Sequence, residues 1–197
     1  MADDFFESVY ARAEGDDAAV PWQHAISRRL VEEWLADLEP DHHRRALVVA
    51  SGLGDDAAAL AEHGLEVVAF DAAPSAVAWA RRRHPEADVD WQVADLFALP
   101  ADWHAAFDLV VEVFTVQSIA PEQQVAAVEA IHRTVAPGGL LMAVAITVAD
   151  PEEPSGPPWP LRPHVVDALV DGFHVRRHHD EDLAPGLTAR RLELERP

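Results

Sequence analysis

The stretch from Arg45 to Pro74 places the strongest constraint on how this chain can fold. It begins with an apolar run at 46–50, a glycine turn at 51–54 and a stretch with helical periodicity at 55–64. A second apolar run follows at 65–70 and ends on Asp71. Strand, turn, helix, strand and acid is the pattern of one half of a nucleotide-binding α/β fold. The ligand held on the turn is the question that the rest of the sequence has to answer.

The rest of the chain continues the alternation of helices and strands. Helical spacing or helix-start signals predict helices over 3–14, 25–38, 74–84, 121–136 and 164–170. Apolar or alternating runs predict strands over 89–93, 107–113, 140–148, 173–178 and 187–195. The run at 107–113 is almost continuously apolar, as in parallel strands covered on both faces. We therefore expect an α/β, Rossmann-like three-layer sandwich whose seven-stranded, mostly parallel sheet has an antiparallel C-terminal strand.

At 197 residues the chain is expected to form a single domain. Its expected parts are an N-terminal helical cap at 1–44 and a cofactor-binding core at 45–148. A proline-rich active-site loop at 149–163 and a C-terminal helix and hairpin at 164–197 are expected to follow. The loop contains six prolines between 150 and 163, so regular structure is excluded there. Long irregular loops in compact domains are usually functional.

Composition narrows the class of partner. The formal net charge is −20, which repels a phosphate backbone and argues against a nucleic-acid substrate. The chain has no cysteine and no apolar window long enough to span a bilayer. We expect a cytoplasmic, bacterial protein, a monomer or homodimer, that acts on a small molecule and neither binds nucleic acid nor enters a membrane.

The glycine turn is compatible with two kinds of cofactor. Gly52, Gly54 and Ala57 satisfy G-x-G-x-x-A, and Asp71 lies 19 residues after Gly52, as in dinucleotide sites. A dinucleotide places its pyrophosphate at the start of the following helix. Asp55 and its neighbour Asp56 stand there, and two carboxylates would repel it by about 1 kcal/mol or more per close pair. A cofactor without phosphate fits this turn better.

The chain resembles the class I S-adenosylmethionine-dependent methyltransferases. Four motifs occur in the family's order over 45–148: ASGLG at 50–54, the acid Asp71, VADL at 93–96, and FDLVVE at 107–112 with VAPGGL at 135–140. The resemblance implies that Asp71 accepts from the ribose hydroxyls and Asp95 from the adenine amino group. It implies a cofactor-binding set of Ala50, Gly52, Gly54, Asp71, Ala72, Asp95, Leu96 and Glu112.

Two positions depart from the family pattern. Many relatives have glycine in place of Ala50, and an acid in place of Val48 that helps to hold the methionine amino group. We expect either Glu112 or a backbone carbonyl to take over that role.

A narrower resemblance is to the thiopurine and thiol/halide methyltransferase branch. It rests on Pro21-Trp22, on the missing acid, and on the GPPW sequence at 156–159. The branch implies a small substrate enclosed by the N-terminal segment and the proline-rich loop. The expected substrate-contacting residues are Trp22, Phe114, Gln117 and Trp159. The alternative role is packing of a loop for the two tryptophans, and covering of the following helix for Phe114 and Gln117. His24 is the candidate general base, with a solvated or capping histidine as the alternative, and the catalytic residues are otherwise unknown.

We therefore expect methyl transfer from S-adenosylmethionine to a thiol, halide, nitrogen or oxygen acceptor by in-line displacement. One rival is an NAD-dependent oxidoreductase using the same turn, and another is a cofactor-binding relative without turnover. The histidines lack metal-site spacing, so no metal is expected. Arg81, Arg82 and Arg83 are expected to form a solvated helix end, and Trp34, Trp79 and Trp91 to pack in or near the core.

Overall fold

A computed structural model describes residues 2–13, 16, 19–20, 25–38, 44–148 and 156–197. The chain divides into two compact units, residues 1–98 and 99–197, which are described in turn. None of the helices in these described ranges is both long and apolar enough to cross a bilayer. The assignment of the whole chain to one domain with four parts stays a prediction.

Three parallel strands form the centre of the first unit. They are β1 (Arg45–Val49), β2 (Glu66–Asp71) and β3 (Val89–Val93), in the order β3-β2-β1. Every residue of β2 after Glu66 is buried, and so is every residue of β1 after Arg45. These runs are apolar because the strands are covered on both faces.

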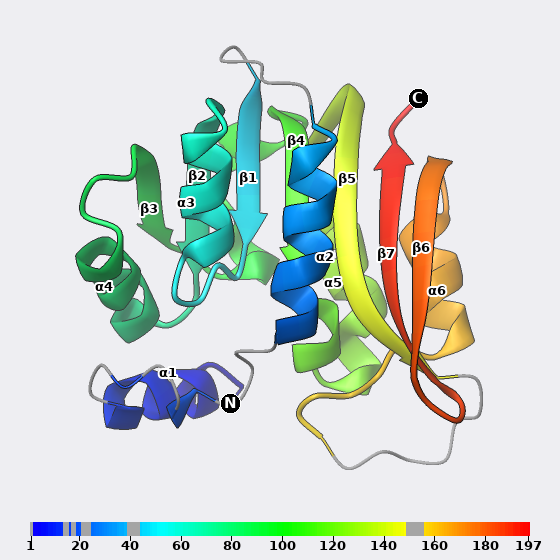
Figure 1. Cartoon of the computed structure of the whole chain (residues 1–197), viewed down its shortest axis with the longest axis horizontal. Coiled ribbons are helices and arrows are strands. Elements are labelled where there is room, and N and C mark those ends of the chain that lie inside the picture. Colours follow the sequence, from blue (N-terminus) through cyan, green and yellow to red (C-terminus); the bar gives the residue numbers. More distant parts are fainter. Residues whose placement is uncertain (1, 14–15, 17–18, 21–24, 39–43, 149–155) are drawn as a thin grey trace. The chain divides into compact units, whose positions relative to one another are not determined.

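Two helices connect these strands by parallel crossovers (Figure 1). Helix α3 (Asp55–Glu62) joins β1 to β2, and α4 (Pro74–Arg83) joins β2 to β3. Pro74 occupies the first turn of α4, where its missing N–H costs nothing. Both helices pack on the strands, and α2 (Ala25–Ala36) contacts α3. The predicted elements between 45 and 93 are confirmed, with ends that differ by one or two residues.

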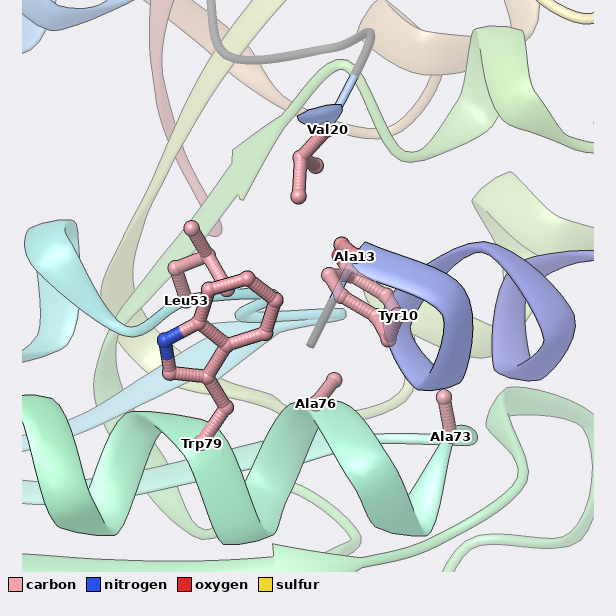
Figure 2. Packing of buried hydrophobic residues seen from close by; sticks show 7 residues of the cluster. All are labelled: Tyr10, Ala13, Val20, Leu53, Ala73, Ala76 and Trp79. Atoms are coloured by element: carbon pink, nitrogen blue, oxygen red, sulfur yellow. The ribbon is translucent and has the colours of Figure 1, made fainter. Parts of the chain in front are cut away.

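The N-terminal helix α1 (Ala2–Ala13) packs against α4. Figure 2 shows the contact, in which Tyr10 and Ala13 face Leu53 of the glycine turn and Ala76 and Trp79 of α4. The rings of Tyr10 and Trp79 meet edge to face, with centroids 6.5 Å apart. The helix predicted over 3–14 therefore packs against the glycine turn at 51–54. The predicted burial of Trp34, Trp79 and Trp91 is confirmed.

The second unit holds the other four strands. They are β4 (Phe107–Val113), β5 (Val135–Val148), β6 (His174–Ala184) and β7 (Leu187–Glu195), in the order β4-β5-β7-β6. Strands β4 and β5 are parallel, whereas β7 is antiparallel to both of its neighbours. Helix α5 (Gln124–His132) precedes β5, and α6 (Pro163–Val170) packs on α5 and β5. The α/β class and the seven-stranded mixed sheet with antiparallel C-terminal pairing are confirmed.

Two predicted boundaries between 121 and 140 are wrong. The helix from Pro121 was expected to end near Ala136, but a 3₁₀ turn (Pro121–Gln123) precedes α5, which ends at His132, and β5 already starts at Val135. Its Pro-Gly-Gly segment lies in a register shift, because Phe107 pairs with Val135 and Leu109 next pairs with Leu140. The Gly138 N–H donates to the Arg196 carbonyl over 2.8 Å. The Pro-Gly-Gly segment resembles a helix stop, but backbone pairing with Arg196 makes it part of a strand.

The C-terminal hairpin is longer than predicted. Strand β6 was expected to end near 178 but continues to Ala184. Its second half is polar and exposed, and Arg190 of β7 binds Asp180 of β6 through two contacts of 2.8 and 2.6 Å. This pairing lowers the pKa of Asp180. Antiparallel pairing with β7, reinforced by this ion pair, therefore extends a strand that its own residues do not predict.

Candidate functional site

The glycine turn between β1 and α3 has a backbone that few side chains tolerate. Ala50, Gly52 and Gly54 all have positive φ, at 47°, 53° and 84°. A Cβ atom on Gly54 would lie 2.4 Å from the Trp91 ring. The Ser51 N–H donates to the Phe70 carbonyl over 2.8 Å, which ties the turn to β2. Glycine at position 54 is therefore required both by conformation and by space.

Asp71, the last residue of β2, is bonded to this turn. One carboxylate oxygen accepts from the Gly52 N–H and the other from the Ala73 N–H, each over 2.9 Å. The side chain is 6% exposed, and burial raises its pKa. Each oxygen has a further lone pair. The structure thus brings together Gly52 and Asp71, which were predicted as site residues although they lie 19 positions apart.

The acids at the start of α3 do not present the bare negative charge that the sequence suggests. Asp55 binds Arg28 over 3.1 Å and Arg83 over 2.9 Å. Burial raises the pKa of Asp56 to about 6. Repulsion of a pyrophosphate is therefore weaker than expected at this turn. The prediction that Arg83 is merely solvated is wrong, because it closes an ion pair with a residue 28 positions away.

The adenine-side residues predicted from the sequence follow β3. Asp95 is exposed, and its carboxylate accepts from the Phe97 N–H over 2.9 Å. Leu96 begins a short 3₁₀ helix (Leu96–Ala98) and is buried. The Ala94 N–H donates to the Asp71 carbonyl over 3.1 Å, so this loop is held at the carboxyl end of β2. Ala72, between Asp71 and Ala73, is exposed.

In the second unit, Glu112 is a fully buried carboxylate near the end of β4. One oxygen accepts from the Thr115 N–H over 2.9 Å, and the other oxygen has no hydrogen-bond partner among the residues that the structure describes. Burial raises its pKa to about 7. A buried acceptor without a donor is costly in either protonation state. Glu112 is therefore ready to receive a donor that the described residues do not supply.

The residues after β4 hold the GPPW segment in place. Phe114 is buried with φ of 60°, a strained conformation for a bulky residue. The Gln117 carbonyl accepts from the Trp159 N–H over 2.6 Å, while the Gln117 side-chain oxygen accepts from the Ile146 N–H over 2.7 Å. Gln124 donates to the Trp159 carbonyl over 3.1 Å. The structure thus brings together Gln117 and Trp159, and gives Gln117 a positioning role.

Comparison with known proteins identifies the family to which these features belong. Residues 46–139, about half of the chain, match the family model described as a methyltransferase domain. The match includes the glycine turn, Asp71 and all of β4. This segment belongs to the methyltransferase domain family.

A curated relative of this chain is also a methyltransferase. Demethylmenaquinone methyltransferase of Beutenbergia cavernae is 34% identical over 116 residues, which make up 58% of this chain and 42% of that protein. The chain spans less than half of the length of the curated relatives that it matches.

Solved structures share the fold of this methyltransferase domain. The N-methyltransferase NodS from Bradyrhizobium japonicum, in complex with S-adenosyl-L-homocysteine, has a TM-score of 0.76 at 17% identity, covering 100% of this chain and 98% of that one. The [4+2]-cyclase SpnF has a TM-score of 0.71 at 19% identity, covering 92% and 84%. One is a methyltransferase and the other a cyclase, so the fold alone does not determine the reaction.

Several residues around the turn of the methyltransferase domain were missed at the sequence level. Tyr10 and Glu7 reach the turn and α4 from α1, and Ser51 carries a buried hydroxyl. Helical spacing indicates only that Tyr10 lies on an apolar face, so no local signal identifies its neighbour. Two predicted residues, Trp22 and His24, lie outside the described residues. The described part of the chain contains no group of three or more acids and histidines able to hold a metal ion.

Ala50 gives a direct test of the backbone of this turn. Its φ of 47° lies in the left-handed region, where a Cβ is unfavourable. We expect Ala50→Gly to stabilise the protein by about 1 kcal/mol, which raises Tm by roughly 2–4 °C. Thermal unfolding in parallel with Ala72→Gly, a change at the nearby site after β2, measures the effect. A Tm for Ala50→Gly at or below that of the wild type would contradict the strained conformation.

Proposed function

We propose that this protein transfers the methyl group of S-adenosylmethionine to a small-molecule nucleophile. The observation that carries the proposal is the Asp71 carboxylate, which two backbone N–H groups hold against the glycine turn. Its orientation is fixed before any ligand arrives, and its remaining lone pairs suit the vicinal hydroxyls of a ribose. The methyltransferase domain match over 46–139 supports this cofactor over NAD.

The residues present fit the rest of the cofactor. The set that we expect to hold it is Ala50, Gly52, Gly54, Asp71, Ala72, Asp95, Leu96 and Glu112. The unpartnered Glu112 oxygen supports a role in accepting the methionine ammonium, because Val48 leaves the usual acid position apolar and buried. A carboxylate in this role gains the donor and the positive charge that its burial requires.

The bound cofactor supplies an electrophilic methyl group on a sulfonium. The chain has to align the acceptor with that methyl group and exclude water. We expect Trp22, Phe114, Gln117 and Trp159 to line the acceptor site and His24 to serve as a base where the acceptor needs one. The half-buried Trp159, with both backbone groups bonded, is a rigid platform for this purpose. The GPPW segment supports an acceptor of the thiopurine or thiol/halide kind.

The test is a methyl-transfer assay. The protein is incubated with S-adenosylmethionine and a panel of thiols, halides, amines and phenols, and S-adenosylhomocysteine and methylated products are measured by mass spectrometry. We expect acceptor-dependent formation of both. Cofactor binding without product from any acceptor class would instead favour a cofactor-binding relative that has lost turnover.

A further inference from the structure

Strand β6 is the last strand of the sheet, with its outer edge turned away from β7. Among the described residues β7 is its only strand partner, and Figure 1 shows β6 beyond β7. Every residue of β6 is exposed except Glu181, which is partly buried. A strand of 11 residues at a sheet edge presents a row of backbone N–H and C=O groups with which another strand can pair.

Charged side chains divide β6 into two halves of opposite sign. Arg176 and Arg177 lie in its first half, and Asp180, Glu181 and Asp182 lie in its second half. Charges of a single sign along an edge strand would keep a second copy of that strand away. Halves of opposite sign attract an antiparallel copy instead, because each half then faces the opposite charge.

Strand β7 already shows that this order of charges supports antiparallel pairing. Arg190 of β7 binds Asp180 through contacts of 2.8 and 2.6 Å. In the other half of the hairpin the Arg177 side chain lies 3.8 Å from Glu193 and is still 57% exposed. An antiparallel copy of β6 presents its acids and arginines in the same order as β7 does. Guanidinium groups have several donors and carboxylates several acceptor positions, so each can serve neighbours on both sides.

One register pairs both the charged and the apolar side chains of β6. When His179 faces its own counterpart at a two-fold axis, Arg177 lies opposite Glu181 of the second copy. Val175 and Leu183, which are 49% and 38% exposed, then lie opposite each other at the two ends. The central pairs fall in the regular stretch of β6 between its two register shifts. The charged and the apolar residues therefore favour the same alignment.

We propose that β6 pairs with β6 of a second copy of this chain, antiparallel about a two-fold axis at His179, to form a homodimer. The interface is isologous, because the same strand serves both copies. Backbone hydrogen bonds join the two strands, and the cross-strand side-chain pairs select the partner and the register. This pairing concerns the edge of the sheet and does not depend on the cofactor or on the reaction.

The register is tested by cross-linking, because the chain contains no cysteine. His179→Cys introduces a single thiol, and diamide should oxidise two such thiols at the axis to a disulfide, which gives a dimer on non-reducing electrophoresis. Val175→Cys and Leu183→Cys are matched controls on the same exposed strand. In the proposed register each control thiol lies about 27 Å along the sheet from its counterpart, so neither variant should form the dimer.

The association itself is measured by sedimentation velocity over a range of protein concentrations. Physiological ionic strength screens the repulsion between chains of net charge −20, and we expect the wild type to dimerise reversibly there. A variant with Arg176→Glu and Arg177→Glu should raise the Kd of the dimer by about tenfold or more. A second variant, with Glu181→Lys and Asp182→Lys, should do the same. An equimolar mixture of the two variants should regain the wild-type affinity, because their strands carry opposite charges.

Four results would overturn the proposal. They are a wild type that stays monomeric at every concentration, charge variants that dimerise as well as the wild type, variants that stay monomeric when mixed, and control thiols that cross-link as readily as His179→Cys. Asp180 is kept in every variant because it binds Arg190 within the hairpin. Thermal unfolding of each variant confirms that the fold is intact.

Discussion

Asp71→Asn is expected to weaken binding of S-adenosylhomocysteine by about 100-fold or more. The carboxylate has four acceptor positions, and backbone N–H groups of Gly52 and Ala73 take one on each oxygen. Asparagine replaces one oxygen with an NH₂ group, which meets a backbone donor instead of accepting from it. Two charge-assisted bonds to the ligand, at about 1.5–3 kcal/mol each, are lost or weakened. Calorimetric titration of the variant measures the loss.

The same substitution should also lower stability. One backbone N–H near the turn loses its acceptor, which costs about 1–3 kcal/mol. Urea unfolding without ligand separates this cost from the binding effect. Glu66→Gln is the matched control, because it changes the acid at the other end of β2, whose side chain is 71% exposed. Equal affinities of Asp71→Asn and Glu66→Gln for S-adenosylhomocysteine would mean that the cofactor is not held by Asp71.

Glu112→Gln is expected to change how stability depends on pH. Burial raises the pKa of Glu112 from its ordinary value of 4.5 to about 7. Between these values the folded chain holds a proton that the unfolded chain has released. The contribution of Glu112 is therefore fully present below about pH 4.5 and is lost as the pH rises to about 7, an effect of roughly 3 kcal/mol. Glutamine has no proton to lose at this position.

Urea unfolding of both proteins at several pH values measures this difference. The stability of Glu112→Gln relative to the wild type should rise by roughly 3 kcal/mol from pH 4.5 to 7.5. The pH dependence that remains in the variant should include Asp56, whose pKa burial raises to about 6 in the same direction. A difference between the two proteins that is constant with pH would show that Glu112 is not buried in an uncompensated state.

The sequence predicts the parts of this site that are local. Asp71 and the glycine turn are recognised because strand, turn and helix follow one another without interruption. The role of Asp55 is misjudged because its partners, Arg28 and Arg83, lie on two other helices. Tyr10 is missed for the same reason, since nothing within α1 shows that its apolar face packs beside Gly52.

In the fold, too, local sequence patterns predict some elements, whereas others depend on residues that are distant in the chain. Apolar runs locate β1, β2, β3 and β4 to within a residue or so of their ends. The start of β5 and the length of β6 depend on pairing with residues near the C-terminus. Pro137 and Gly138 favour a helix stop locally, but pairing with Arg196 places them in a strand. Local propensity therefore predicts the first unit better than the second.

Titration of the purified chain with S-adenosylhomocysteine, and separately with NAD, tests the central claim most directly. We expect saturable binding of S-adenosylhomocysteine, no binding of NAD, and loss of the former in Asp71→Asn. Tight binding of NAD with none of S-adenosylhomocysteine would contradict the account and identify the turn as a dinucleotide site.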